Sequence, residues 1–397
     1  MTLVPPRNIV GLFVAVAFAI WVLTVLGGVG RCTGGPSEYL SNDQDEDRLN
    51  KLRWDIQCLQ VTTLNERPPT TPRLHLFMPI NRGAAGQRFC RSVLTAIVHG
   101  YDPLIYNWDR EGDYGSLQLA KVEGESQHTA TSLRNVLGTH LATASESDYV
   151  LMTDAMDVWF QLSPSFLVKR FEELDAEVVI GADRMCAPNN PESPECKGVP
   201  QSPLPTWLFS NLNGATERLD SFGPPRWANS GTVMGSLQAV RRLFETLAEI
   251  MKSPDYDQWA TDGDQAAFNV FLSQGKLVVD PRFRLFWATS YDVQSMVWMN
   301  TPYPPDNVSD TFTPWSLYPP LAHHKHTGEV PVVVHMNDNR KSFIEDWWGE
   351  PWFSKPRAMF QDVVRRRVQN VTLRIAHDTG IRTHLLRDIC EAHLDLW

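Results

Sequence analysis

A short apolar run that ends in two acidic residues is the feature that most constrains the fold of this chain. Residues 149–152 read Tyr-Val-Leu-Met, and Asp154 and Asp157 follow directly after them. A continuous apolar run of this length is typical of a strand that is covered on both faces. Ligands in open α/β sheets collect at the carboxyl ends of the strands. We therefore expect the two acids at the ligand-binding edge of a buried sheet.

Strand-like and helix-like segments alternate from about residue 72 onwards. Strands are predicted at residues 74–78, 103–106, 149–152, 177–181, 277–280 and 331–335. Helices are predicted at residues 89–99, 133–141, 164–174, 238–251 and 264–273. This alternation predicts an α/β fold with a parallel or mixed sheet and helices on both faces. A long insert at residues 188–225, rich in Pro, Asn and Ser, is of the kind that forms a functional loop.

The amino-terminal part predicts a membrane anchor. Residues 9–30 carry no charge over 22 residues, a length that matches a bilayer span of ~20 residues. A cleaved signal peptide has a shorter apolar core of ~7–15 residues. We therefore predict a cytosolic tail at 1–8, a transmembrane anchor at 9–30, a stem at 31–71, the globular domain at 72–350 and a C-terminal helical extension at 351–397. The expected location is the Golgi or endoplasmic reticulum membrane, in type II orientation with a luminal catalytic domain.

Two other features agree with a luminal location. Asn307 and Asn370 each begin an N-glycosylation sequon. The chain has 6 cysteines, an even number that permits disulfides in an oxidising compartment. Cys186 and Cys196 flank a Pro-rich loop and are the pair we expect, whereas the other pairings stay open. The net charge of −10 argues against a nucleic-acid partner.

Asp154, Asp157 and His335 are candidate metal ligands. The two acids either cap a turn or hold a divalent cation that in turn binds a diphosphate. His335 ends the predicted strand at 331–335, where it is either structural or a third ligand. One imidazole with two carboxylates suits Mn²⁺ better than Ca²⁺, which prefers oxygen ligands alone. Lys341 lies six residues further on and is either a surface lysine or a phosphate contact.

Two further segments contain residues that could contact the reacting sugars. Asp262 and Asp264 lie at a predicted helix start, where they either cap the helix or, facing a cleft, stabilise a cationic transition state or orient an acceptor hydroxyl. Asn229 stands before Ser230 and Gly231. This segment is either a turn between two strands or an acceptor-side loop in which the Asn229 amide holds sugar hydroxyls, since glycine allows close backbone approach.

Taken together, these motifs resemble the glycosyltransferase domain of procollagen galactosyl- and lysyl-hydroxylase-type enzymes, within the GT-A class. The matching segments follow one another in the family's order over roughly residues 72–341. They are Asp154-Ala-Met-Asp157, Asn229-Ser230-Gly231, Asp264-Gln265, and His335-Met-Asn337-Asp338 followed by Lys341. The sequence departs from the family at Met156, where the family has a tyrosine that stacks on the base, and at Met336 and Asp338, where it has glycines.

The resemblance implies a GT-A (Rossmann-like) fold, Mn²⁺, a UDP-sugar donor and retention of anomeric configuration. It implies metal contacts by Asp154, Asp157 and His335, and a place for Asp264 near the reacting sugar. The residues that it places in contact with the donor are Met156, Asn337, Lys341, Lys121 and Trp108.

The sequence thus predicts a membrane-anchored hexosyltransferase that moves a sugar from a UDP-sugar to a glycan or glycoprotein acceptor with the help of Mn²⁺. Asp264, Asp262 and Asn229 are the expected catalytic residues. Two alternatives stay open. One is a catalytically inert, anchored sugar-binding protein with the same fold, which Met156 and Asp338 suggest. The other is a hydrolase of sugar nucleotides.

Overall fold

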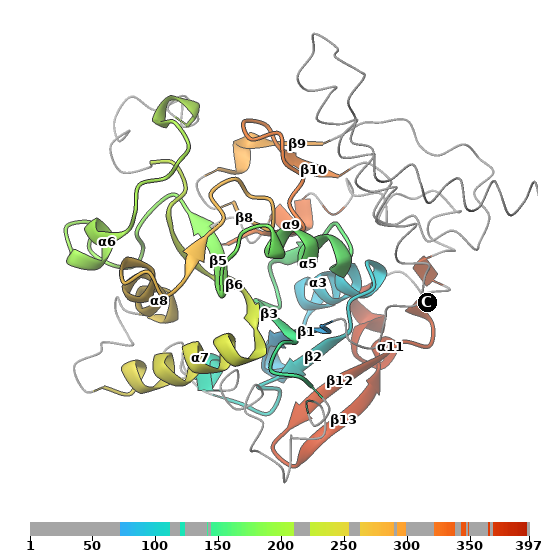
Figure 1. Cartoon of the computed structure of the whole chain (residues 1–397). Helices are drawn as coiled ribbons and strands as arrows, with labels where there is room; N and C mark the ends of the chain where they lie inside the picture. Colours follow the sequence, from blue (N-terminus) through green and yellow to red (C-terminus); the bar gives the residue numbers. More distant parts are fainter. Residues whose placement is uncertain are drawn as a thin grey trace, which may run out of the picture. The chain divides into compact units, whose positions relative to one another are not determined.

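An eight-stranded mixed sheet organises the part of the chain that the structure describes (Figure 1). The computed structural model describes residues 72–111, 120–123, 141, 144–209, 223–253, 263–289, 292–298, 321–337, 343–346, 348, 364–365 and 368–394. All of them belong to one structural unit, Thr70–Trp397. The other unit is Met1–Pro69. The predicted anchor at residues 9–30 and the stem at 31–71 lie outside the described residues.

The strands of the main sheet follow the order β13-β12-β2-β1-β3-β6-β5-β7. They are β1 (Leu74–Pro79), β2 (Pro103–Tyr106), β3 (Tyr149–Thr153), β5 (Val178–Asp183), β6 (Trp227–Ser236), β7 (Val278–Val279), β12 (Thr372–His377) and β13 (Gly380–Leu385). Strands β12, β2, β1 and β3 run parallel, whereas β6 is antiparallel to both β3 and β5. The carboxyl ends of β1, β2, β3 and β5 therefore share one edge.

Two smaller sheets lie beside this edge. One contains β4 (Val158–Phe160), β11 (Val333–His335) and β8 (Phe286–Ala288), in that order. The other pairs β9 (Met296–Trp298) with β10 (Ala322–His324). Because β4 follows β3 after only a short loop, the chain passes directly from the main sheet into the three-stranded one. That passage carries Asp154 and Asp157.

Helices cover both faces of the main sheet (Figure 1). The α-helices of the described residues are α3 (Gln87–Val98), α5 (Pro164–Glu172), α6 (Pro194–Gly198), α7 (Leu237–Met251), α8 (Gly263–Ser273), α9 (Phe343–Asp346) and α11 (Leu386–Cys390). Short 3-10 helices are η2 (Arg82–Ala84), η3 (Thr206–Leu208), η5 (Val293–Ser295) and η8 (Glu391–His393). In the part that the structure describes, no helix is long and apolar enough to span a membrane.

The core shows why β3 and α7 form where they do. Successive strand residues point to opposite faces, so Val150 and Met152 of β3 share one cluster with the apolar stripe of α7. Ser236 caps the start of helix α7, and its side chain accepts a hydrogen bond from Ala239 N at 3.2 Å. Phe244 of that stripe is completely buried. The strand is apolar on both faces because helices cover both.

The C-terminal part of the chain contains a strand hairpin where a helical extension was predicted. Residues 351–397 were expected to form a helical extension, but β12 and β13 form a hairpin that extends the main sheet next to β2. The segment Thr-Leu-Arg-Ile-Ala-His of β12 alternates polar and apolar residues, which is the period of a strand rather than of a helix. The globular unit therefore extends well beyond residue 350.

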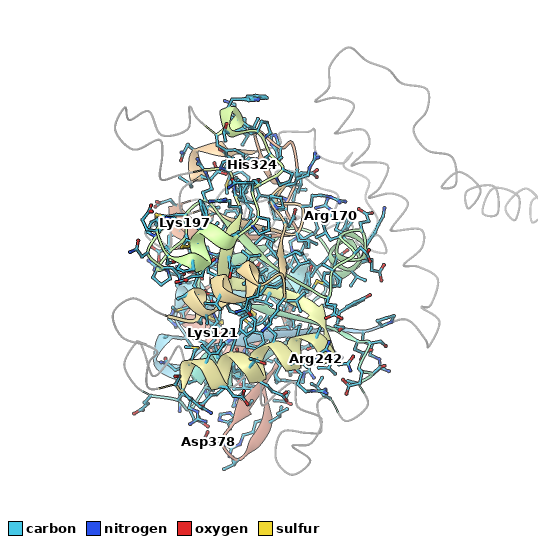
Figure 2. All side chains as sticks on the ribbon, turned by 60° about the vertical axis from the view of Figure 1, so that its left-hand side comes forward. Lys121, Arg170, Lys197, Arg242, His324 and Asp378 are labelled. Carbon is cyan, nitrogen blue, oxygen red and sulfur yellow. A yellow bond between two sulfur atoms is a disulfide. The ribbon has the colours of Figure 1, made fainter. Side chains whose placement is uncertain are left out.

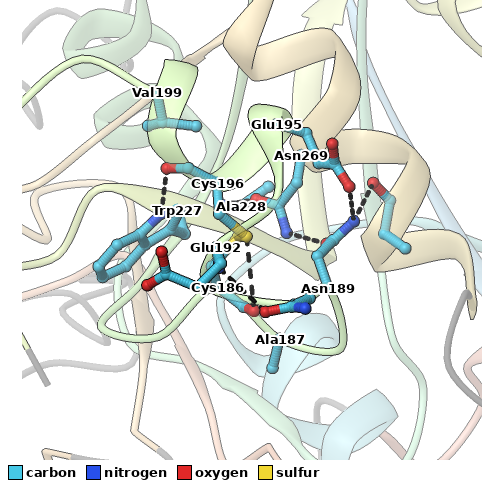
Figure 3. Close-up of a disulfide and its surroundings, with 12 residues drawn as sticks. Cys186, Ala187, Asn189, Glu192, Glu195, Cys196, Val199, Trp227, Ala228 and Asn269 are labelled. Atoms are coloured by element: carbon cyan, nitrogen blue, oxygen red, sulfur yellow. Dashed lines mark hydrogen bonds between the residues drawn. A yellow bond between two sulfur atoms is a disulfide. The ribbon is translucent and has the colours of Figure 1, made fainter. Parts of the chain in front are cut away.

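Two disulfides are present among the described residues. The expected pair, Cys186–Cys196, is confirmed. Figure 3 shows it beside Trp227, whose indole donates to Cys196 O at 3.2 Å. The second disulfide, Cys90–Cys390, joins α3 to α11 across 300 residues of sequence. Cys32, Cys58 and the sequon at Asn307 lie outside the described residues, whereas Asn370 is exposed just before β12.

Candidate functional site

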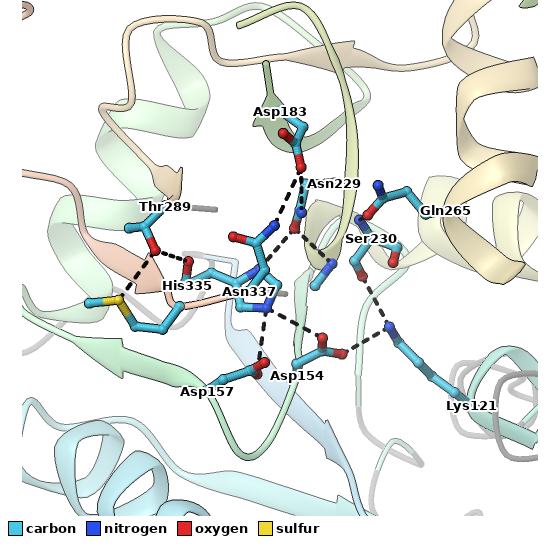
Figure 4. Close-up of polar contacts among 12 residues, drawn as sticks. Lys121, Asp154, Asp157, Asp183, Asn229, Ser230, Gln265, Thr289, His335 and Asn337 are labelled. Atoms are coloured by element: carbon cyan, nitrogen blue, oxygen red, sulfur yellow. Dashed lines mark hydrogen bonds and ion pairs between the residues drawn. The ribbon is translucent and has the colours of Figure 1, made fainter. Parts of the chain in front are cut away.

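The three candidate metal ligands come together at the edge where the strands end (Figure 4). Each of Asp154, Asp157 and His335 offers one ligand atom, and these atoms lie within 4.8 Å of one another. His335 Nε2 lies 3.4 Å from Asp154 Oδ2 and 3.5 Å from Asp157 Oδ1. His335 and Asp157 are buried, whereas Asp154 is partly exposed. The group therefore has a sheltered side and an open side.

Backbone hydrogen bonds hold the three ligands in place. His335 pairs with Val158 in the antiparallel β4–β11 ladder. Met336 N donates to Asp157 O at 2.6 Å, which continues that ladder by one step. On the other side, Asp154 N donates to Gly231 O at 2.8 Å, next to the β3–β6 ladder. The ligand positions are thus set by strand register rather than by a loop.

A chain of hydrogen bonds fixes the ring of His335. Its Nδ1 lies 2.8 Å from Asn229 Oδ1, and Asn229 Nδ2 donates to Asp183 Oδ2 at 3.2 Å. Because the carboxylate accepts from the amide nitrogen, the amide oxygen must face the imidazole and accept from Nδ1–H. The Nε2 atom is then directed at the two acids. A hydrogen-bonded partner of this kind is what a metal-binding histidine requires to hold its orientation.

Gly231 makes room for that ring. A Cβ at this position would lie 2.0 Å from His335 Cε1 and 2.5 Å from His335 Nδ1. No side chain can occupy that space while the ring stays where it is. The Asn-Ser-Gly motif therefore has a steric reason for its last residue.

The same motif is not the turn or loop that we considered from the sequence. It lies inside β6, at an irregularity in the β5–β6 ladder where the register shifts between Ile180 and Gly181. Gly181 pairs with Asn229, whereas Ile180 pairs with Val233. The residues between Asn229 and Val233 thus lack partners in β5. Bulges of this kind change the direction of side chains and occur next to active sites.

Lys121 connects the candidate ligands to the second acidic segment. Its Nζ lies 2.9 Å from Asp154 Oδ1 and 2.7 Å from Asp264 Oδ2, and it donates to Ser230 O at 3.2 Å. The family resemblance implied that Lys121 contacts the donor. The structure shows it as a buried cation between two acids of the site.

Asp264 lies at the first turn of α8, and its Oδ2 faces Lys121. Its Oδ1 accepts a hydrogen bond from Ser230 Oγ at 2.9 Å. The neighbouring Gln265 accepts from Ser230 N at 3.3 Å and donates to Ala187 O at 2.7 Å. Asp264 is buried, so its carboxylate does more here than cap an exposed helix end.

These contacts shift the pKa values of the site. Burial alone would lower the pKa of His335, but the charges of Asp157 and Asp154 outweigh it and raise the pKa to about 9. Burial also opposes the charged form of Lys121, yet Asp154 and Asp264 raise its pKa above the usual range. The pKa of Asp154 is lowered against the effect of burial, mainly by Lys121. For Asp183 burial dominates and raises the pKa.

The residues present fit a divalent cation. His335 Nε2 is buried and makes no ordinary hydrogen bond, although it points between two carboxylates. A nitrogen and two carboxylate oxygens are a donor set that can hold divalent ions such as Mn²⁺ and Zn²⁺. An ion would take the place that the proton on Nε2 takes without it.

The other residues predicted to contact the sugar donor lie in different surroundings. Asn337 follows β11 and donates from Nδ2 to Asp183 Oδ2 at 3.4 Å, so it does border the site. Met156 is half-buried in the short loop between the two acids. Trp108 is buried and packs against Phe89, as a core residue does. Its donor contact stays a prediction.

Asp262 and Lys341 lie outside the described residues, so their predicted roles stay predictions. Asp183 is a residue to which the sequence analysis gave no role in the site. It ends β5, and its neighbour in the sheet is Trp227 of β6. The rule that carboxyl ends of parallel strands gather ligands would have found it, because β5 runs parallel to β1 and β3.

Comparison with known proteins adds little to this site. No family model matches the chain, and no curated protein matches it. Among solved structures, the galactosyltransferase LgtC in complex with donor and acceptor sugar analogues is 13% identical and covers 73% of this chain and 95% of its own, with a TM-score of 0.31. The bifunctional glycosyltransferase WbbM is 12% identical and covers 76% of this chain and 52% of its own, also at 0.31. These values are too low to show a family.

Proposed function

We propose that this protein is a metal-dependent glycosyltransferase that uses a nucleoside diphosphate sugar. The observation that supports it best is the meeting of Asp154, Asp157 and His335 within 4.8 Å, with the Lys121–Asp264 pair directly beside them. In such an enzyme, the metal that binds the diphosphate has to lie next to the polar group that contacts the sugar. Here Lys121 joins the two.

On the diphosphate side, Asp154, Asp157 and His335 would hold the cation. The bound ion would act as a Lewis acid on the diphosphate and stabilise the charge that develops as it leaves. The residues themselves supply geometry: Asn229 and Gly231 hold the His335 ring, and the β4–β11 ladder holds Asp157. The partly exposed Asp154 marks the side from which a donor would approach.

On the sugar side, the site offers carboxylates and amides within one cluster. Ser230 Oγ donates a hydrogen bond to Asp264, and Asn229 Nδ2 donates one to Asp183. Hydroxyl groups both donate and accept, so acids and amides that already pair with each other can exchange partners with a sugar. Asp264 is the residue we assign to the reacting sugar, because Lys121 keeps it close to Asp154 and thus to the diphosphate.

We also propose that the ion is Mn²⁺, that the donor is a UDP-sugar and that the reaction retains anomeric configuration. The catalytic unit lies on the luminal side of a Golgi or endoplasmic reticulum membrane, held by an anchor at residues 9–30. What supports the anchor is the uncharged 22-residue run in the sequence. What supports Mn²⁺ is the mixed nitrogen and oxygen donor set.

The test uses the purified full-length chain with a panel of UDP-sugars and Mn²⁺, and measures UDP release with and without acceptor glycans. Release that requires both Mn²⁺ and an acceptor is expected. Asp157→Ala should abolish it while the melting curve stays close to wild type. Asp346→Ala, which removes an exposed acid in α9, is the matched control and should be fully active.

Three results would contradict the proposal in different ways. UDP release at full rate without any acceptor would make the protein a sugar-nucleotide hydrolase. Glycan binding that needs neither UDP nor Mn²⁺, with no release from any donor, would make it an inert sugar-binding protein. Full transfer activity in Asp157→Ala would remove the metal site from the reaction.

A further inference from the structure

A second cluster of histidines lies outside the candidate site, on the C-terminal hairpin. His377 ends β12, and His384 lies in β13. Their two Nε2 atoms are 3.2 Å apart. Figure 2 labels Asp378 at the turn of this hairpin. Asp109, shortly after β2, completes the cluster through a carboxylate that reaches His377.

The distance between the two nitrogens suits two ligands of one ion. Nitrogen ligands bind zinc at about 2.0–2.1 Å. Two such ligands would lie about 3.4 Å apart at a tetrahedral angle and about 2.9 Å apart at a right angle. The observed 3.2 Å between His377 and His384 falls between these values. The two rings face each other with the same type of nitrogen, Nε2.

Asp109 gives His377 the environment of a metal ligand. Both of its carboxylate oxygens lie close to His377 Nδ1, at 2.9 and 3.1 Å. The backbone N–H of Asp378 donates to the same carboxylate at 3.2 Å. An acid in this position holds the proton on Nδ1 and leaves the lone pair of Nε2 free of it. Carboxylate–histidine–metal arrangements have this form.

The protein ligands of this site are two imidazole nitrogens, so the ion has to be one that binds imidazole strongly. Zn²⁺ and Cu²⁺ meet this condition, whereas Mn²⁺ and Ca²⁺ bind such nitrogen sites weakly.

We propose that His377 and His384 form a second metal site, which binds one Zn²⁺ or Cu²⁺ ion with Asp109 as the supporting carboxylate and water as the remaining ligands. The ion would cross-link β12 to β13, and the contact between Asp109 and His377 Nδ1 joins this hairpin to the segment after β2. The site does not depend on the glycosyltransferase assignment, because none of its residues belongs to the cluster around His335.

Zinc binding to the full-length chain tests the proposal. Zn²⁺ is titrated against a chromophoric chelator, and stoichiometry and affinity are compared between variants. Wild type should bind one Zn²⁺ more than His384→Gln, whose amide can still hydrogen-bond to His377. Asp109→Asn should keep the site but weaken it about 10–100-fold. His393→Gln, in the neighbouring η8, is the matched control and should leave binding unchanged.

A measurement on wild type alone guards against misfolded variants. Diethyl pyrocarbonate acylates accessible imidazole nitrogens, and peptide mass spectrometry reads the extent at each histidine. Zn²⁺ should protect His377 and His384 but not His393. Equal zinc stoichiometry in wild type and His384→Gln, or equal acylation of both rings with and without Zn²⁺, would show that the rings only hydrogen-bond to each other and would overturn the proposal.

Discussion

The space that Gly231 leaves for His335 gives a prediction whose size follows from the structure. In Gly231→Ala the new Cβ would lie 2.0 Å from His335 Cε1. Carbon atoms in contact need about 3.5 Å, so the ring must retreat by about 1.5 Å. The bond from His335 Nδ1 to Asn229 Oδ1, now 2.8 Å, does not survive such a shift. The backbone is not the obstacle, because Gly231 lies within β6 and does not have a positive φ.

We expect two effects from this variant. Overpacking of a buried site costs about 1–3 kcal/mol of the free energy of unfolding. Displacement of one ligand should weaken Mn²⁺ binding about 10–100-fold, as loss of a supporting contact does in other metal sites. Chemical denaturation measures the first effect and isothermal titration with Mn²⁺ the second. Gly86→Ala is the control, because a Cβ there would meet nothing within 4 Å.

A double variant separates the clash from other causes. In a His335→Ala background the ring is absent, so Gly231→Ala should no longer destabilise the protein, although metal binding stays weak. If Gly231→Ala costs as much stability in that background as in wild type, the clash is with something other than His335. If Gly231→Ala binds Mn²⁺ like wild type, the geometry of the proposed ligand set is wrong.

Four further predictions follow from the same contacts. Asn229→Ala should weaken Mn²⁺ binding about 10–100-fold in titration calorimetry, because the His335 ring loses its acceptor. The stability that protonated His335 adds to the metal-free chain should be complete below about pH 6.5 and should vanish as the pH rises through about 9. Over the same pH range, Mn²⁺ binding should strengthen and release a proton. Calorimetry in buffers of different ionisation enthalpy detects that proton. Lys121→Met should cost about 3 kcal/mol in chemical denaturation, since it leaves two acids without their cation, and Mn²⁺ should restore part of the loss. Replacing Cys90 and Cys390 by serine should cost about 2–4 kcal/mol in the same assay; an unchanged midpoint would show that this cross-link adds nothing.

The central strands could be predicted because their signal is local. The run before Asp154 is apolar at every position, and such a run has few alternatives in an α/β chain. The helices predicted at residues 238–251 and 264–273 begin within one residue of α7 and α8 and end where they end. The prediction of a ligand edge followed from the strand ends, and the structure brings Asp154, Asp157 and His335 together at that edge.

The rest depended on contacts that no local pattern encodes. The Asn229–Gly231 segment looks like a turn in sequence, because nothing there announces that β5 skips several residues of β6. Asp183 acts on His335 through Asn229, across two strands. The hairpin of β12 and β13 joins β2 although more than 250 residues of sequence separate them. Which strands pair depends on the folded chain, so the local sequence pattern indicates a strand but not its neighbour in the sheet.

The charges of the site explain how it can fold before it binds a metal. Asp154, Asp157 and Asp264 place three carboxylates within one cluster, and Lys121 neutralises one of them. Unpaired buried charge is costly, so a second positive charge has to be present. Without a metal, the proton on His335 provides it, since the same acids raise the pKa of that ring to about 9. When a divalent ion enters, that proton leaves, and the net charge of the cluster changes by one unit instead of two. Metal binding is therefore an exchange of one cation for another in a cluster that Lys121 and the strand ladders already hold together.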